Sequence, residues 1–263
     1  MARILSALVL LPVVIGTVWF LPPWGTLLLA LVAAALAFHE YTTIAGGLGT
    51  HLPRGVVGAA VLAACAAVGG GLVGAEIVLM TALIAVGAMA VGAGQPGPAV
   101  LRDSAASIFP IVYIGLPLGA LAATRLLGGR EAVLLLMATI VISDSAQYYA
   151  GRSLGRRPLA PSISPKKTRE GAVGGLLFGT VALFAGGRWV FPTADPLLLG
   201  LVAACVVALG IVGDLFESLL KRSAGVKDSS SLIPGHGGVL DRIDSWLFAA
   251  PVFYVFVRYL HTS

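Results

Sequence analysis

Two aspartates lie near the ends of apolar runs, where a charged side chain has a high energetic cost. Asp214 comes eight residues before Arg222, and Asp144 comes eight residues before Arg152. Eight residues of helix rise about 12 Å, so both carboxylates are expected below a membrane surface and at a similar depth. A carboxylate at that depth needs a cavity, a cation or a partner. The two aspartates therefore indicate a polar site with residues from two helices.

More polar residues follow in the C-terminal part of the sequence. Four of them are spaced i, i+3, i+4 and i+7 and so share one helix face: Asp214, Glu217, Ser218 and Lys221. Asp241 and Asp244 are one helical turn apart where the chain enters its last apolar run. Mg²⁺ takes oxygen ligands and is usually held by one or two carboxylates plus substrate phosphates. The predicted metal ligands are Asp144, Asp214, Asp241 and Asp244.

Simple ion pairs are an alternative explanation for these acids, because Asp and Glu also pair with Lys and Arg at helix ends. One such pair would be explained in that way. Four acids beside two basic loops favour a site for a hard cation and for phosphate.

A glycine-rich loop precedes the last apolar run and reads VKDSSSLIPGHGG over residues 226–238. Glycines let backbone N–H groups approach phosphate oxygens, and the N-terminus of the following helix favours anions. Lys227 adds a positive charge. His236 has two interpretations: it binds phosphate or transfers a proton, or it only caps the turn. The loop is predicted to bind phosphate.

A second basic loop, residues 151–171, reads GRSLGRRPLAPSISPKKTREG. Its prolines favour an extended path that can follow a membrane surface. Its basic residues are Arg152, Arg156, Arg157, Lys166, Lys167 and Arg169. Positive charge of this kind also sets membrane topology and attracts anionic lipid. The two explanations agree if the site binds the phosphate of a lipid.

Helices that cross a membrane must position these residues. Hydrophobic residues make up 58% of the 263 residues and charged residues only 11%, against about 25% charged residues in soluble domains. The backbone must satisfy its own hydrogen bonds in lipid, which favours helices, and about 20 apolar residues cross a bilayer. The candidate spans are residues 4–21, 25–45, 55–73, 76–93, 104–124, 132–150, 172–187, 197–220 and 243–260.

The predicted fold class is therefore all-α: a polytopic transmembrane helical bundle of about nine spans. We expect one integral membrane unit, with N-terminal scaffold helices in residues 1–125 and a catalytic transmembrane region in residues 126–263. His39, Glu40 and Tyr41 lie near the end of the second span, and anchoring at the membrane interface is the favoured interpretation of them. The sequence shows no soluble basic domain, so nucleic acid is not an expected partner.

The distribution of Lys and Arg predicts the orientation, because cytoplasmic loops carry the excess of these residues. With the N-terminus inside, nine spans leave only four of the 17 basic residues outside, namely Arg125, Arg130, Arg188 and Arg258. The two basic loops then lie on the cytoplasmic side. We therefore predict a cytoplasmic N-terminus and an active site that faces the cytoplasm.

Two stretches together resemble a known family. The first contains Ser218, Lys221-Arg222, Lys227-Asp228, Pro234-Gly-His-Gly-Gly, Asp241-Arg242 and Asp244. The second contains Ser143-Asp144, Tyr148, Gly151-Arg152, Gly155, Pro161, Ile163-Ser-Pro-Lys-Lys-Thr168 and Glu170-Gly171. Both are similar to the motifs of phosphatidate cytidylyltransferase, also called CDP-diacylglycerol synthase. Gln147 stands where that family commonly has alanine, and Arg156 where it tends to have lysine.

The resemblance implies that CMP is transferred from CTP to phosphatidic acid, giving CDP-diacylglycerol and pyrophosphate for phospholipid biosynthesis. It implies Mg²⁺ and allows K⁺ as a second metal, and it allows a homodimer. It also implies a bacterial-type cytoplasmic (inner) membrane, with membrane lipids as partners. The implied catalytic residues are Asp214, Asp241, Lys221, Arg222 and Lys227. The implied substrate-binding residues are Ser218, Asp228, Pro234, Gly235, His236, Gly237, Gly238, Arg242, Arg152, Lys166, Lys167, Thr168 and Arg169.

Two other functions are alternatives on the sequence. A polyprenol or phytol kinase also uses CTP but would transfer its γ-phosphate instead of CMP. An ion-coupled transporter would use intramembrane carboxylates to carry protons or Na⁺. The glycine-rich loop and the clustered lysines argue against the transporter.

Overall fold

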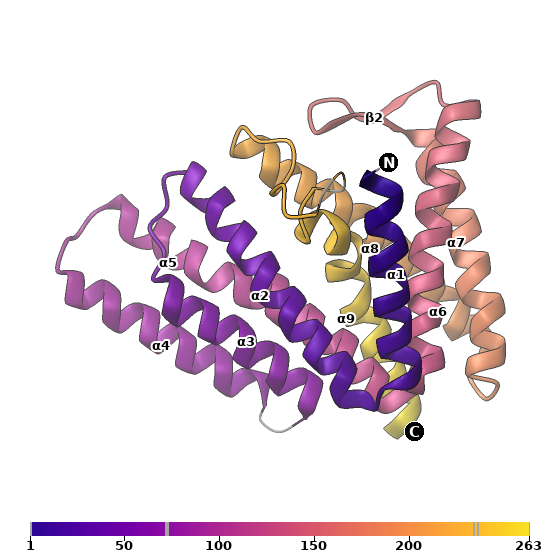
Figure 1. Ribbon diagram of the computed structural model, residues 1–263, viewed down its shortest axis with the longest axis horizontal. Coiled ribbons are helices and arrows are strands. Elements are labelled where there is room, and N and C mark those ends of the chain that lie inside the picture. The colour runs from indigo at the N-terminus through magenta and orange to yellow at the C-terminus, as the bar shows by residue number, and fades with distance from the viewer. Residues whose placement is uncertain (1, 72–73, 234, 236, 263) are drawn as a thin grey trace. The chain divides into compact units, whose positions relative to one another are not determined.

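The structure is a computed structural model (Figure 1) that describes residues 2–71, 74–233, 235 and 237–262. Helices dominate it, which confirms the predicted all-α class. They are α1 (Ala2–Phe20), α2 (Pro23–Gly47), α3 (Arg54–Gly70), α4 (Ala75–Ala93), α5 (Pro98–Pro110), the π-helical turn η1 (Ile111–Gly115), α6 (Leu116–Leu154), α7 (Arg169–Val190), α8 (Pro196–Ser223) and α9 (Leu240–Thr262). Two short strands are β1 (Pro158–Ala160) and β2 (Ser164–Thr168).

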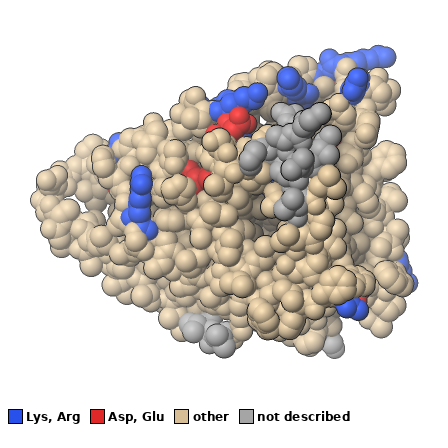
Figure 2. All heavy atoms as spheres, in the orientation of Figure 1, with Lys and Arg blue, Asp and Glu red and all other residues tan. Residues whose placement is uncertain are grey.

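Six helices of the described chain are long and apolar enough to cross a membrane, judged by length and composition. They are α2, α4, the helical run Pro98–Leu154, α7, α8 and α9. Two shorter apolar helices are Leu10–Phe20 and Arg54–Gly70. These helices fit the predicted polytopic membrane protein, and the number of about nine spans stays a prediction. Figure 2 agrees with this class, because most of the surface in view is neither acidic nor basic.

The chain divides into two compact units. The first consists of Met1–Leu126 and Leu220–Arg242, and the second of Leu127–Leu219 and Ile243–Ser263. The first unit therefore contains the glycine-rich loop in addition to the N-terminal helices. The second unit contains the hairpin of β1 and β2 and most of α6, α7, α8 and α9.

Small residues let helices of the first unit pack closely. A Cβ on Gly115 would come within 2.7 Å of Val61 O, and one on Gly119 within 2.7 Å of Cys65 O. Glycine at these positions therefore allows α3 to lie directly against η1 and the beginning of α6, as is common between membrane helices. Figure 1 shows α2, α3 and α4 side by side within this unit.

α5, η1 and α6 form one helical run from Pro98 to Leu154, where the sequence predicted two spans. Pro110 lacks the N–H that a regular helix needs, and the wider turn of η1 follows it. Gly129 leaves helical geometry with φ 78° and ψ −179°, a conformation that glycine adopts without steric cost. The run is thus broken between the two predicted spans, 104–124 and 132–150.

α7 packs against its neighbours in the second unit through a stripe of buried glycines. They include Gly171, Gly175, Gly179 and Gly187. A Cβ on Gly175 would come within 3.0 Å of Ser143 O on α6 and would overlap with the side chain of Gln147. The stripe therefore brings the backbones of α6 and α7 into close contact just below the basic loop.

The basic loop between α6 and α7 forms a small antiparallel hairpin. Pro158 pairs with Thr168, and Ala160 pairs with Ser164. The extended path that the prolines favour is therefore present, although strands were not predicted. Thr168 also caps α7, because its Oγ1 accepts a hydrogen bond from Gly171 N at 3.1 Å, a common arrangement for a short polar residue before a helix.

Candidate active site

The hairpin brings a lysine to α8 within the second unit. Lys167 lies on β2, and its Nζ forms an ion pair with Asp214 Oδ2. The Asp214 side chain is 27% exposed, so solvent or a ligand can still reach it, whereas Lys167 Nζ itself is buried. The structure thus brings together two residues that the sequence predicted for the site.

Asp244, on α9, has three other carboxylates around it, one of which is Asp214. Asp244 on α9 is close enough to Asp214 and Glu217 on α8, and to Asp144 on α6, for their negative charges to repel it. α8 and α9 approach closely at this level, because a Cβ on Gly213 would come within 2.6 Å of Asp244 O. Like charges disfavour one another's ionised form unless a cation compensates them. The second unit therefore brings three carboxylates within electrostatic range of Asp244.

Gln147 orients one of these acids. Its Nε2 donates a hydrogen bond to Asp144 Oδ1 at 3.0 Å. The glutamine side chain fits beside α7 only because Gly175 has no Cβ. One turn further along α6, Arg152 donates from Nη1 to the hydroxyl of Tyr148 at 3.0 Å. The glutamine that departs from the resembled motif therefore acts directly on a predicted metal ligand.

Glu170 fixes the base of the hairpin. Its Oε2 accepts hydrogen bonds from Arg156 N at 3.0 Å and from Arg157 N at 3.2 Å. The side chains of Lys166 and Arg169 are exposed. The backbone of the hairpin is therefore held in place while these two cations stay accessible to anionic groups.

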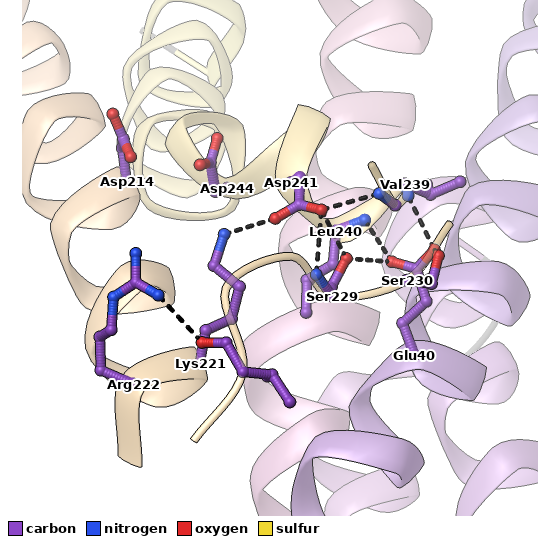
Figure 3. A network of polar contacts seen from close by, with 12 residues as sticks. Glu40, Asp214, Lys221, Arg222, Ser229, Ser230, Val239, Leu240, Asp241 and Asp244 are labelled. Atoms are coloured by element: carbon purple, nitrogen blue, oxygen red, sulfur yellow. Dashed lines mark hydrogen bonds and ion pairs between the residues drawn. The ribbon is translucent and has the colours of Figure 1, made fainter. Parts of the chain in front are cut away.

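Asp241 is the centre of a polar network in the first unit (Figure 3). Its Oδ1 forms an ion pair with Lys221 Nζ. Its Oδ2 accepts hydrogen bonds from Ser229 N at 3.0 Å and Gly238 N at 2.7 Å, and Ser229 Oγ, which has only one proton to donate, lies 2.9 Å away. The aspartate side chain is only 5% exposed. Asp241 therefore joins the end of α8, the glycine-rich loop and the start of α9.

Glu40 on α2 is the second acid of this network. Its Oε2 accepts from Ser229 Oγ at 2.8 Å and from Leu240 N at 2.7 Å. Its Oε1 accepts from Ser230 Oγ at 2.7 Å and from Val239 N at 2.8 Å. The residue is 1% exposed, and Figure 3 shows its carboxylate pointing at the loop.

The interpretation of Glu40 as an interfacial anchor is therefore wrong, because its side chain is buried in the loop network. One signal in the sequence could have found it. Glu40 is the only Asp, Glu, Lys or Arg between residues 4 and 53. A single charge in a long uncharged stretch must have a buried partner or a function, and here it has partners in a distant segment.

The network also changes the interpretation of the glycine-rich loop. Backbone N–H groups of the loop and of the following helix N-terminus were expected to approach phosphate, but those of Gly238, Val239 and Leu240 donate to Asp241 and Glu40. Protein carboxylates thus occupy the anion position at the N-terminus of α9. Phosphate binding by this segment must rely on other groups, of which the side chains of Lys227 and Arg222 are exposed.

Comparison with known proteins decides the family. The family model described as the cytidylyltransferase family matches residues 1–260. The chain belongs to the cytidylyltransferase family. Its membership confirms the family resemblance that the two motifs indicated.

Several relatives of this cytidylyltransferase-family chain are similar over part of their length. A phosphatidate cytidylyltransferase of Haemophilus influenzae is 47% identical over 129 residues, which are 47% of this chain and 45% of the relative. One of Pseudomonas aeruginosa is 47% identical over 123 residues, 45% of each chain. The uncharacterized protein YnbB of Escherichia coli is 46% identical over 138 residues, 52% of this chain and 45% of the relative. The matched part is thus just under half the length of these relatives.

The residues predicted for the cytidylyltransferase site fall in both units. The second unit holds Asp144, Arg152, Lys166, Lys167, Thr168, Arg169, Asp214, Ser218 and Asp244. The first unit holds Lys221, Arg222, Lys227, Asp228, Gly235, Gly237, Gly238, Asp241 and Arg242. Pro234 and His236 lie outside the described residues. The prediction that all of these residues form one site stays a prediction.

Several of the predicted site residues already make hydrogen bonds or ion pairs within the protein. Arg222 donates from Nη1 to Val226 O at 3.1 Å, whereas Lys221 is buried against Asp241. Thr168 serves as the cap of α7. Gly237 has φ +81°, and a Cβ there would come within 2.6 Å of Asp241 Oδ2, so this position needs glycine.

The acids of the second unit suit Mg²⁺ by donor type, because they supply carboxylate oxygens. The repulsion between Asp244 and its neighbours is a second point of agreement. Among the described residues, however, no three His, Cys, Asp or Glu side chains are close enough to hold a metal ion as they stand. Asp241 fits less well than the others, because a metal there would have to replace the Lys221 ammonium.

Proposed function

We propose that the chain transfers CMP from CTP to phosphatidic acid and so produces CDP-diacylglycerol and pyrophosphate. The observation that carries this proposal is the family match over residues 1–260, to which relatives named phosphatidate cytidylyltransferase add support. The grouping of carboxylates and lysines on α8, α9 and the hairpin also supports it, since these side chains can handle both a cation and phosphates.

The chemistry needs little proton transfer. The phosphate of phosphatidic acid is already a nucleophile at neutral pH, so the reaction depends on in-line positioning and on neutralising charge. In the second unit, the exposed cations Lys166 and Arg169 are suited to hold an anionic head group or nucleotide. In the first unit, Arg222, Lys227 and Arg242 are exposed and suited to CTP phosphates. Lysine acts as a point charge on phosphate, and arginine can bind it through two N–H groups.

Mg²⁺ held by Asp144, Asp214 and Asp244 would neutralise the CTP phosphates and the leaving pyrophosphate. Before it binds, Lys167 compensates the charge of Asp214, and Gln147 keeps Asp144 oriented. Asp241 holds the loop that carries Lys227. K⁺ as a second metal and a homodimer belong to the proposal through the family resemblance alone.

The proposed location is a bacterial-type cytoplasmic (inner) membrane, with the N-terminus and the active site on the cytoplasmic side. The Lys and Arg distribution supports this orientation, because only four of the 17 basic residues fall on the opposite side when nine spans are assumed. CTP is then available to the basic hairpin and to the glycine-rich loop.

Labelled CTP tests the proposed reaction. The purified chain in detergent is given Mg²⁺, phosphatidic acid and CTP labelled at either the α- or the γ-phosphate. We expect the α-label in the lipid fraction and the γ-label in pyrophosphate. A γ-label in the lipid would instead identify a lipid kinase. Ion or solute movement in liposomes without any CDP-lipid would identify a transporter, and either result would refute the proposal.

A further inference from the structure

Glu40 carries a buried charge that the proposed reaction does not use. It lies on α2, in the part of the chain that was expected to be mainly scaffold, and it is 1% exposed. The donors that the structure describes around its carboxylate are two serine hydroxyls and two backbone N–H groups, all of them neutral. A buried carboxylate is costly unless hydrogen bonds compensate it. The four donors that converge on Glu40 therefore indicate that it has a specific structural role.

The position of the carboxylate explains its stability. Val239 N and Leu240 N lie at the N-terminus of α9, where unpaired N–H groups and the helix dipole favour an anion. Glu40 supplies that anion from a helix that is 199 and 200 residues distant in the sequence. α2 therefore caps α9, and it does so through a single side chain.

Ser229 extends the contact to the predicted catalytic residues. Its Oγ lies 2.8 Å from Glu40 Oε2 and 2.9 Å from Asp241 Oδ2, and its N donates to Asp241. Asp241 in turn forms the ion pair with Lys221. A Cβ on Gly238 would overlap with both Glu40 Oε2 and Ser229 Oγ. With the Glu40 carboxylate and Ser229 in these positions, residue 238 has room only for glycine.

We infer that Glu40 is a positioning residue, which holds the described residues of the loop 226–239 in the conformation that presents Lys227 to CTP, while Arg222 at the end of α8 contacts the start of this loop through Val226 O. This inference rests on the proposed function. Without the carboxylate, the loop samples other conformations, and CTP binds only the fraction that is ordered. The apparent affinity then falls by that fraction, whereas turnover of the saturated enzyme changes little.

Glu40→Gln tests the inference, because it keeps the size of the side chain and replaces one acceptor by an NH₂ group that opposes the donors. Glu76→Gln is the matched control, since Glu76 is an exposed acid of the same unit. We expect the KM for CTP to rise on the order of tenfold in Glu40→Gln, with kcat within threefold of the wild type. Glu76→Gln should match the wild type in both.

A merely structural effect would give a different result. Partial unfolding lowers the amount of active enzyme and so lowers kcat while KM stays constant. Ser230→Ala supplies the second variant, because Ser230 Oγ donates to Glu40 Oε1. We expect Ser230→Ala to raise the KM for CTP about threefold when it is made alone. In the Glu40→Gln background it should raise the KM less than twofold, because the effects of substitutions at interacting residues are not additive.

Trypsin gives a readout that does not need activity. Lys221 and Arg222 precede the anchored loop and Lys227 lies at its start, so loosening of the loop should speed cleavage at these residues at least fivefold in Glu40→Gln relative to Glu76→Gln. If the wild type makes no CDP-lipid, the proposed function fails, and faster cleavage would still support the anchor. Unchanged cleavage together with an unchanged KM for CTP would overturn the inference. If Glu40→Gln does not fold, the rate of trypsin cleavage and the KM for CTP are measured on Ser230→Ala instead, and the same outcomes support or overturn the inference.

Discussion

At the scale of single residues, two predicted catalytic aspartates each hold a lysine ammonium. Lys167 pairs with Asp214 in the second unit, and Lys221 pairs with Asp241 in the first. Their surroundings differ, because the Asp214 side chain is 27% exposed and that of Asp241 is 5% exposed. Asp241 also accepts two hydrogen bonds from backbone N–H groups of the loop. Asp214 is therefore the acid that can exchange its partner for a ligand, whereas Asp241 mainly stabilises the loop.

Asp214→Asn should remove activity without affecting the fold. The amide cannot compensate a cation, and loss of one preorganised charge typically costs about 10²-fold to 10³-fold in kcat. Asp195→Asn is the matched control, because Asp195 Oδ1 accepts from Leu198 N at the start of α8 and Asn caps helices as well as Asp. CDP-lipid formation and thermal unfolding in detergent measure both effects. Retained activity in Asp214→Asn would contradict this assignment.

Asp241→Asn should behave differently, because it removes the negative charge of Asp241 from the buried Lys221 ammonium. Removal of one partner of a buried ion pair commonly costs about 3–5 kcal/mol. We therefore expect the midpoint of thermal unfolding to fall clearly in this variant but not in Asp214→Asn. Equal midpoints for the two variants would show that the Asp241 network does not stabilise the unit.

At the scale of elements, close packing of α6 and α7 places Asp144 and the hairpin. Gly175 lets the two backbones approach, and Gln147 then fits between them and donates to Asp144. Ser143 O lies 3.0 Å from where a Cβ of residue 175 would stand. The position of a predicted metal ligand thus depends on a glycine in a neighbouring helix.

Gly175→Ala should therefore destabilise the second unit by about 1–3 kcal/mol, the usual cost of an overpacked contact. Gly200→Ala is the control, because the nearest atoms to its added Cβ lie at 3.8 Å, an ordinary contact. Gln147→Ala removes the overlapping side chain, so it should restore part of the stability in the double variant. Thermal unfolding in detergent checks all three, and equal stability of Gly175→Ala and Gly200→Ala would refute the packing argument.

The helices could be predicted from the sequence because hydrophobicity is a local property. Every predicted span overlaps a helix of the structure, and the predicted gap between residues 124 and 132 contains the break at Gly129. The Glu40 network could not be predicted in this way. Its partners are 189 to 200 residues distant, and one sequence does not reveal which distant donors meet a carboxylate. The strands of the hairpin were missed because prolines indicate extended backbone but no pairing partner.

At the scale of the whole molecule, the proposed activity depends on how the chain is oriented in the membrane. α7 has 22 residues, which at about 1.5 Å per residue span roughly the 30 Å of a hydrocarbon core. The basic hairpin precedes α7, and the short connection to α8 follows it. The two ends of α7 are therefore predicted to lie on opposite sides of the membrane.

Cysteine labelling tests this orientation. In a chain with Cys65 and Cys205 replaced by alanine, Ser162→Cys places an exposed thiol in the hairpin and Thr193→Cys one beyond α7. A membrane-impermeant maleimide should label the first variant only in inverted vesicles and the second only in right-side-out vesicles. Labelling of both variants from the same side would contradict the predicted topology.

The proposed reaction is tested best by the ratio of pyrophosphate released to CDP-diacylglycerol formed by the purified chain. With CTP, Mg²⁺ and phosphatidic acid, we expect one pyrophosphate per CDP-diacylglycerol, no release without phosphatidic acid, and loss of both products in Asp214→Asn. Lipid that carries the γ-phosphate of CTP would contradict the proposed reaction, and undiminished product formation by Asp214→Asn would contradict the proposed role of Asp214.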